Sequence, residues 1–148
     1  MLDELRRRID GKRLTIVGVG NPLRGDDGVG VALVERLQGQ TSATLVNASD
    51  VPENYLGVIE SARPQVVVMV DAVNLGAQPG DVAFLEIEQL ARTRVSTHNA
   101  SLALFAEVLR QSTGADILVL GIQPSTLAFG APLSAPVQAA LEKLTQVF

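Results

Sequence analysis

Three side chains that lie far apart in the sequence form a set suited to acid–base or metal chemistry. Asp27 follows a glycine-rich turn, Asp71 ends an apolar segment, and His98 is the single histidine of the chain. Two carboxylates and an imidazole suit a divalent ion such as zinc or nickel. The same carboxylates could instead exchange protons with a water molecule in the absence of any metal. The residue types alone leave both chemistries open.

The glycine-rich turn that carries Asp27 does not have the composition of a nucleotide-binding turn. From Gly18 to Gly30 it reads GVGNPLRGDDGVG. A dinucleotide-binding G-x-G-x-x-G pattern needs its last glycine so that the helix can pack closely behind a bound pyrophosphate, and Leu23 stands at that position. Two carboxylates at the start of the next helix would also repel a phosphate. We interpret Asp26 as a cap of that helix and Asp27 as the functional residue.

The elements expected to position these side chains alternate between strand and helix. The predicted strands are residues 14–17, 43–47, 65–71, 82–87 and 116–122, and the predicted helices are residues 29–37, 53–60, 100–111 and 137–148. Residues 65–71 are apolar on both faces, which favours a central parallel strand. Asn99 is predicted to cap the helix over residues 100–111. We therefore expect an α/β fold: a single three-layer domain over residues 1–148, with a mainly parallel, twisted sheet and helices on both faces.

Such a sheet is expected to bring the three side chains together. Ligands of open parallel sheets bind beyond the carboxyl ends of the strands, and Asp27 and Asp71 each follow or end a predicted strand. Taken singly, an aspartate at a strand end commonly bonds only a neighbouring turn, and a single histidine such as His98 is commonly a packed polar group. Their expected convergence at one edge favours a functional site.

Composition narrows the classes of function. The net charge of −4 and the 3% aromatic content argue against nucleic-acid binding. The absence of cysteine removes disulfides, thiol catalysis and thiolate metal sites. The apolar runs are shorter than the roughly 18 residues of a membrane span, and the N-terminal segment lacks the apolar core of a secretory signal. We expect a cytoplasmic protein without membrane insertion.

Four motifs in order resemble those of the NiFe-hydrogenase maturation endopeptidase family. They are residues 18–30, Val70-Asp71-Ala72, Ser96-Thr97-His98-Asn99 and Gly121-Ile122-Gln123-Pro124. The resemblance extends over nearly the whole chain. Residues 51–54 and 97–99 are most similar to the subgroup that processes the large subunit of hydrogenase 3-type enzymes.

The resemblance implies an endopeptidase, a hydrolase that removes the C-terminal extension of a hydrogenase large-subunit precursor after nickel insertion. By matching motif, the catalytic and metal-contacting residues of the family fall on Asp27, Asp71 and His98, although many members have glutamate at the first position. The nickel is expected to be supplied by the substrate, and zinc or cadmium is expected to occupy the site in vitro. We further expect Asn21 and Gln123, at the same edge, to orient the substrate backbone.

Other functions stay open on the sequence. A metal-sensing chaperone of the same fold would hold the precursor without cutting it. A nucleotide-binding module is disfavoured by Leu23 and by the adjacent carboxylates of Asp26 and Asp27. A peptidase of similar fold could also act on an unrelated substrate.

Overall fold

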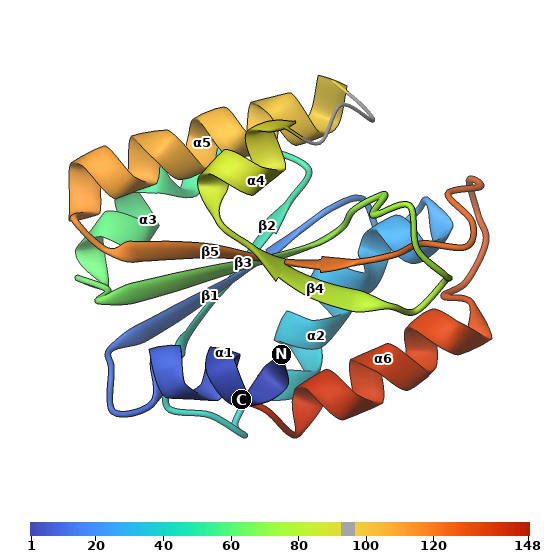
Figure 1. Cartoon of the computed structure of the whole chain (residues 1–148), viewed down its shortest axis with the longest axis horizontal. Coiled ribbons are helices and arrows are strands. Elements are labelled where there is room, and N and C mark those ends of the chain that lie inside the picture. Colours follow the sequence, from blue (N-terminus) through green and yellow to red (C-terminus); the bar gives the residue numbers. More distant parts are fainter. Residues whose placement is uncertain (93–96) are drawn as a thin grey trace.

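A five-stranded sheet between two layers of helices forms the computed structural model of the chain (Figure 1). The structure describes the backbone of residues 1–92 and 97–148, and the side chains of residues 1–92 and 101–148. The strands, which lie side by side in the order β2-β1-β3-β5-β4, are β1 Leu14–Val19, β2 Thr44–Ser49, β3 Val66–Ala72, β4 Val82–Leu85 and β5 Asp116–Ile122. All neighbouring pairs are parallel except β4 with β5. The predicted mainly parallel sheet is therefore confirmed.

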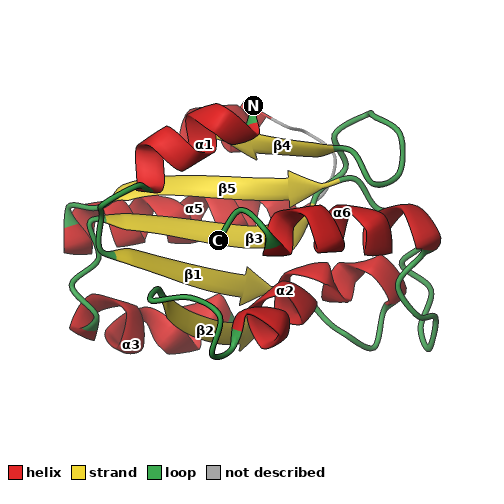
Figure 2. Ribbon diagram, turned by 90° about the horizontal axis from the view of Figure 1, so that it is seen from below, coloured by secondary structure: helices red, strands yellow, loops and turns green. Residues whose placement is uncertain are grey.

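Two groups of helices cover the two faces of the sheet (Figure 2). One face carries α1 Leu2–Ile9, α2 Val29–Leu37 and α6 Ala135–Thr145, and the other carries α3 Leu56–Ser61, α4 Ile87–Arg92 and α5 Thr97–Thr113. Two short 3-10 turns, at Gly25–Gly28 and Pro52–Tyr55, precede α2 and α3. Each layer of helices packs on its face of the sheet around a separate apolar cluster. Strand β3 lies between the two clusters and is buried along its whole length. No described helix is long and apolar enough to cross a bilayer.

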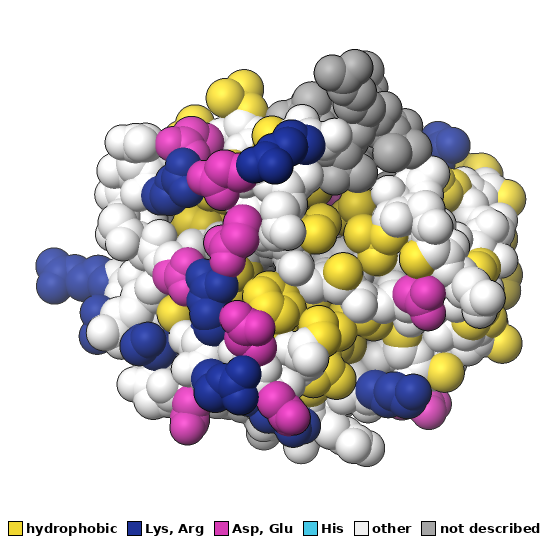
Figure 3. Space-filling model, viewed as in Figure 1, with side chains coloured by type: hydrophobic (Ala, Val, Ile, Leu, Met, Phe, Trp, Pro, Cys, Tyr) yellow, Lys and Arg dark blue, Asp and Glu magenta, His cyan; other side chains and the backbone are white. Residues whose placement is uncertain are grey.

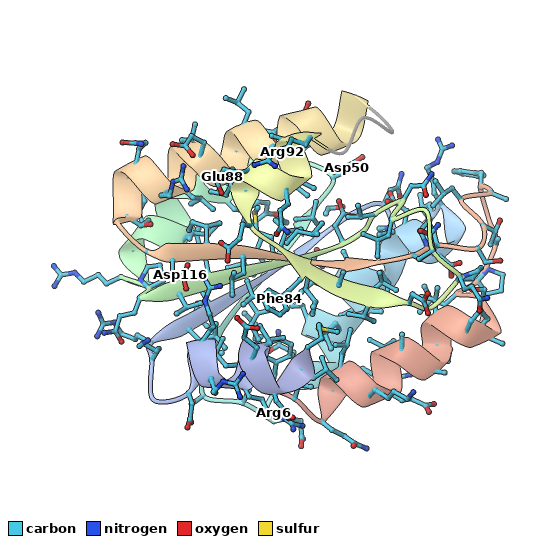
Figure 4. The ribbon with its side chains drawn as sticks, in the orientation of Figure 1. Arg6, Asp50, Phe84, Glu88, Arg92 and Asp116 are labelled. Carbon is cyan, nitrogen blue, oxygen red and sulfur yellow. The ribbon has the colours of Figure 1, made fainter. Side chains whose placement is uncertain are left out.

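The structure corrects the predicted elements at several places, one of which is the last predicted helix, residues 137–148, which is α6 at Ala135–Thr145. Three further differences concern α1, β4 and the start of α5. The N-terminal helix α1 was not predicted, although Leu2, Leu5 and Ile9 have helical spacing and pack on the sheet. The strand predicted over residues 82–87 ends at Leu85, because the unpredicted helix α4 begins at Ile87. Val82 and Phe84 pack against the apolar cluster under α1 and α6, and Figure 4 shows Phe84 on the side of α1.

The third of these differences concerns Asn99, which is not a helix cap. Helix α5 begins at Thr97, so Asn99 lies inside its first turn. Thr97, His98 and Asn99 are compatible with a helix, since none is a glycine or a proline, so the helix can extend toward its N-terminus as far as Thr97. His98, predicted to precede the helix, consequently lies within it.

Glycines at two facing positions allow α2 to lie directly on the sheet. A Cβ atom placed on Gly30 would lie 2.1 Å from the carbonyl oxygen of Val70 and 2.7 Å from that of Val19. A Cβ atom on Gly18 would lie 2.4 Å from the carbonyl oxygen of Gly30. The first turn of α2 can therefore approach β1 and β3 only without side chains, and this approach sets the position of Asp27 just before the helix.

We predict that Gly30→Ala lowers the free energy of unfolding by about 3 kcal/mol or more, because backbone atoms cannot yield to the new methyl group. Gly57→Ala is the matched control: this exposed position in α3 has free space around it, and alanine there should raise stability by up to about 1 kcal/mol. Urea unfolding of the two variants measures both effects. Equal stability of the two variants would contradict the close-approach argument.

Candidate functional site

Asp27 and Asp71 converge at the carboxyl edge of the sheet, as predicted. Asp71 lies near the end of β3 and is fully buried, and Asp27 lies in the 3-10 turn before α2 and is half-buried. Gly20 stands between them: a Cβ atom on it would lie 1.9 Å from the carbonyl oxygen of Asp27 and 3.3 Å from Oδ1 of Asp71. Its φ of +128° also favours glycine. The backbone of Asp27 and the carboxylate of Asp71 thus lie on either side of a single glycine.

The turn after β1 fixes the orientation of the Asp27 carboxylate. The backbone N–H of Asn21 donates to Oδ2 of Asp27 at 2.8 Å. The side-chain oxygen of Asn21 accepts from the N–H of Leu23 at 2.9 Å, which forms an Asx turn. Asn21 therefore holds Asp27 through its backbone and shapes the turn through its side chain. Its role in orienting substrate stays a prediction.

The backbone brings His98 to the same end of the molecule. Helix α5 is connected to β5 by a short turn at Gly114 and runs back along the sheet. Its 17 residues span about 25 Å, close to the about 23 Å of the seven-residue β5. The first turn of α5 therefore reaches the carboxyl edge (Figure 1). The side chain of His98 lies outside the described residues.

A metal site of two aspartates and a histidine consequently stays a prediction. Among the side chains that the structure does describe, no group of three acidic, histidine or cysteine residues is placed to hold an ion. Asp27 and Asp71 lie at one edge, and carboxylates are oxygen ligands of divalent ions. Under this prediction His98 or the substrate supplies a further ligand.

Asp26 does not cap a helix; this prediction is wrong. No side-chain hydrogen bond caps either the 3-10 turn or α2. The fully buried Asp26 carboxylate instead accepts hydrogen bonds from a loop about 100 residues later in the chain. Its partners are the N–H of Ser125 at 2.8 Å, the N–H of Thr126 at 3.1 Å, and the N–H and hydroxyl of Ser134 at 2.7 and 2.8 Å. Adjacent aspartates therefore have different roles, one structural and one at the edge.

These hydrogen bonds determine the charge state of Asp26. Burial raises the pKa of the carboxyl, but the hydrogen bonds that it accepts outweigh burial and hold the pKa below its ordinary value of 3.8. The carboxylate is therefore ionised and links the turn before α2 to the loop at 124–134.

Gln123 is nearly buried at the end of β5 and binds the loop that follows Asp71. Its Oε1 accepts from the N–H of Leu75 at 2.6 Å and from the N–H of Ala77 at 3.3 Å. Its backbone N–H donates to the carbonyl oxygen of Asp81 at 2.8 Å. The residue thus positions the segment after β3. Its predicted contact with substrate is not tested by these bonds.

One residue of this edge carried no signal that we recognised in the sequence. Ser49, at the end of β2, has a φ of +51°, which is unusual for a residue with a side chain. Its carbonyl oxygen accepts from the N–H of Gly20 at 2.7 Å, where the pairing of β1 with β2 shifts register. Ser49 therefore holds the glycine that separates Asp27 from Asp71. The role of Ser49 is visible only from the pairing of β2 with β1.

A wide groove of about 860 Å³ lies at the opposite end of the sheet. Arg6, Lys12, Arg13 and Gln65 are among its lining residues, and it opens where β1 and β2 begin. Ligands of parallel sheets bind at the carboxyl edge. We therefore place the candidate site at Asp27 and Asp71 and not in this larger groove.

Comparisons with known proteins agree on one family. A family model described as hydrogenase maturation protease matches residues 29–148, which include Asp71 and His98 and begin just after Asp27. The hydrogenase 3 maturation protease of Escherichia coli K12 is 30% identical over 131 residues, or 86% of this chain and 83% of that protein. Two solved structures extend the similarity to the region around Asp27.

The crystal structure of the NiFe-hydrogenase maturation protease HycI from Thermococcus kodakarensis matches with a TM-score of 0.89 at 32% identity. The match covers 97% of this chain and 95% of the Thermococcus chain. The solution structure of the endopeptidase HycI from Escherichia coli gives a TM-score of 0.83 at 29% identity, covering 90% and 87% of the two chains. The predicted fold class and the predicted resemblance are both confirmed.

We predict that Asp26→Asn lowers the free energy of unfolding by about 2–4 kcal/mol at neutral pH, because the amide replaces a charged acceptor of several buried donors. Asp10→Asn, at an exposed position, is the control and should change stability by less than about 0.5 kcal/mol.

The difference between wild type and Asp26→Asn should depend on pH. Because the folded-state pKa of Asp26 is lowered, its contribution to stability is present above the ordinary value of 3.8 and is lost as the pH falls through the folded value. Denaturation at a series of pH values should therefore show the two proteins converging in acid. A constant difference down to the lowest pH would contradict this account.

Proposed function

The chain belongs to the hydrogenase maturation protease family, and from this premise we propose that it removes the C-terminal extension of a NiFe-hydrogenase large-subunit precursor once nickel has been inserted. The protein is thus a hydrolase, an endopeptidase. The proposal rests on one observation: Asp27 and Asp71 lie close together at the carboxyl edge of a sheet whose fold matches that of a solved family member. Family membership favours cleavage over the chaperone and nucleotide-binding alternatives.

The two carboxylates have the chemistry that peptide hydrolysis needs. One carboxylate takes a proton from a water molecule whose oxygen bonds to the scissile carbonyl carbon, and that proton then passes to the leaving amine nitrogen. Alternatively, the substrate's nickel polarises the carbonyl as a Lewis acid while the same residues position it. Asp27 is the more accessible of the two carboxylates, and the buried Asp71 lies behind the Gly20 turn.

We propose that Asp27, Asp71 and His98 recognise the nickel that the precursor carries. Carboxylate oxygen and imidazole nitrogen are ligand types that divalent nickel accepts. Under this proposal the metal is part of the substrate, and cleavage depends on its presence there. Zinc or cadmium would occupy the same residues in vitro. A cytoplasmic site of action stays a prediction.

The central experiment follows the mass of a purified large-subunit precursor incubated with the protein. We expect loss of a C-terminal peptide from the nickel-loaded precursor and no loss from its metal-free form. Binding of the nickel-loaded precursor without any change in mass would instead favour the chaperone function. Equal cleavage of both forms would contradict nickel recognition and leave the endopeptidase activity in place.

We predict that Asp27→Asn and Asp71→Asn each lower the rate of cleavage by at least about 100-fold, because an amide can neither accept the proton nor supply the charge. His98→Ala should have a similar effect if the imidazole joins the site. Asp10→Asn, with the same chemical change at the opposite end of the sheet, is the control. Thermal unfolding of each variant checks the fold. Normal processing by a folded variant would remove that residue from the mechanism.

A further inference from the structure

Two loops near Asp27 expose three large apolar side chains. Leu23 is 59% exposed, Leu127 is 47% exposed and Phe129 is 76% exposed. Residues 123–134 contain no charged side chain, in a chain of which 19% is charged. In Figure 3, hydrophobic atoms recur along the right-hand margin, where these loops lie in Figure 1, while charged side chains are concentrated on the other side of the view. We call Leu23, Leu127 and Phe129 the apolar loop surface.

The apolar loop surface is held in place by hydrogen bonds. The Asp26 carboxylate accepts from the loop that carries Leu127 and Phe129, and the N–H of Asp26 donates to the carbonyl oxygen of Thr126 at 2.9 Å. The N–H of Gly130 donates to the carbonyl oxygen of Leu23 at 2.7 Å. The two loops are therefore joined by hydrogen bonds while these apolar side chains stay exposed. A fixed, exposed aromatic side chain among uncharged neighbours is typical of the centre of a protein interface.

A small cavity adjoins this surface. It has a volume of about 140 Å³ and lies where the two loops meet α2, with Pro22, Val31, Ala32 and Leu133 among its lining residues. Of its lining residues, all of which the structure describes, Glu35 alone is charged. This volume is close to that of an apolar cavity, about 150 Å³, that holds a benzene-sized group. The surface thus offers both protruding apolar side chains and a recess for one from a partner.

The apolar loop surface lies next to Asp27, which points to the protein substrate as its partner. Leu23 lies two residues after Asn21, whose N–H orients the Asp27 carboxylate. The carbonyl oxygen of Leu23 accepts from the N–H of Gly130 in the later loop, so a protein substrate whose peptide bond reaches Asp27 lies close to both loops. Resting on the proposed function, we propose that the apolar loop surface and the cavity beside it bind an apolar region of the large-subunit precursor next to the cleavage point. These residues determine affinity and specificity and take no part in the chemical step.

The test combines binding and kinetics. The triple variant Leu23→Ser, Leu127→Ser and Phe129→Ser should raise both the Kd and the KM for the nickel-loaded precursor by about 30-fold or more, with kcat changed by less than about threefold. Ala32→Phe should raise the Kd by about tenfold, because the ring occupies the cavity without removing any exposed apolar side chain. Binding is measured in an Asp71→Asn background, in which cleavage is slow, and each Kd is compared with that of Asp71→Asn alone, so that any loss of nickel recognition is common to both proteins.

The matched control is a second triple variant on the other side of the sheet. Val58, Leu104 and Val108 are also exposed apolar residues, on α3 and α5, and their replacement by serine should leave Kd and KM within about threefold of wild type. Melting temperatures of both triple variants check that each is folded.

Several results would overturn the proposal. They are an unchanged Kd and KM in the loop variant, a larger effect of the control variant, or a fall in kcat with KM unchanged. Sedimentation that shows dimeric wild type and a monomeric loop variant with normal KM would assign the surface to a second copy of the chain. If wild type binds the precursor but does not cleave it, the proposed function fails and the binding data still decide the role of the surface. Absence of binding by wild type would overturn both.

Discussion

Close contact between the backbone of α2 and the backbones of β1 and β3 is the constraint on which the site depends. Gly18 and Gly30 face each other with no space for a methyl group, and Gly20 leaves none between Asp27 and Asp71. Because helix and strands touch through backbone atoms, the turn between them lies directly over the carboxyl edge. The two aspartates are brought together by the lack of side chains at these glycines, and no contact between the aspartate side chains is needed to explain it.

The second constraint is the buried charge of Asp26. An ionised carboxylate is costly to bury unless several donors satisfy it, and here backbone N–H groups and a hydroxyl from a distant loop do so. The same bonds position the uncharged loop at 124–134 beside Asp27. The structural carboxylate of Asp26 therefore stands next in sequence to the candidate site residue Asp27, and Asp26 positions a loop close to it.

The proposed site separates the binding of an apolar region of the precursor from the recognition of nickel and the cleavage of the peptide bond. The carboxylates of Asp27 and Asp71 lie at the edge of a rigid sheet, which keeps their geometry fixed. The proposed contacts with the precursor lie on loops, where a change of side chain alters affinity without disturbing the sheet. Gln123, which precedes the loop at 124–134, binds the segment after Asp71, and Ser49 binds Gly20 at the sheet edge itself.

The sequence by itself determined the five strands, four of the six described α-helices, the mainly parallel sheet and the placement of Asp27 and Asp71 at one edge, because hydrophobic periodicity and the carboxyl-edge rule depend on local pattern. It revealed neither α1 nor α4. It did not determine the role of Asp26. The donors to that carboxylate lie about 100 residues away, and loop geometry that no periodicity encodes brings them together. The start of α5 and the left-handed Ser49 were also decided by the tertiary structure, since helix extension and register depend on packing and strand pairing across the whole chain.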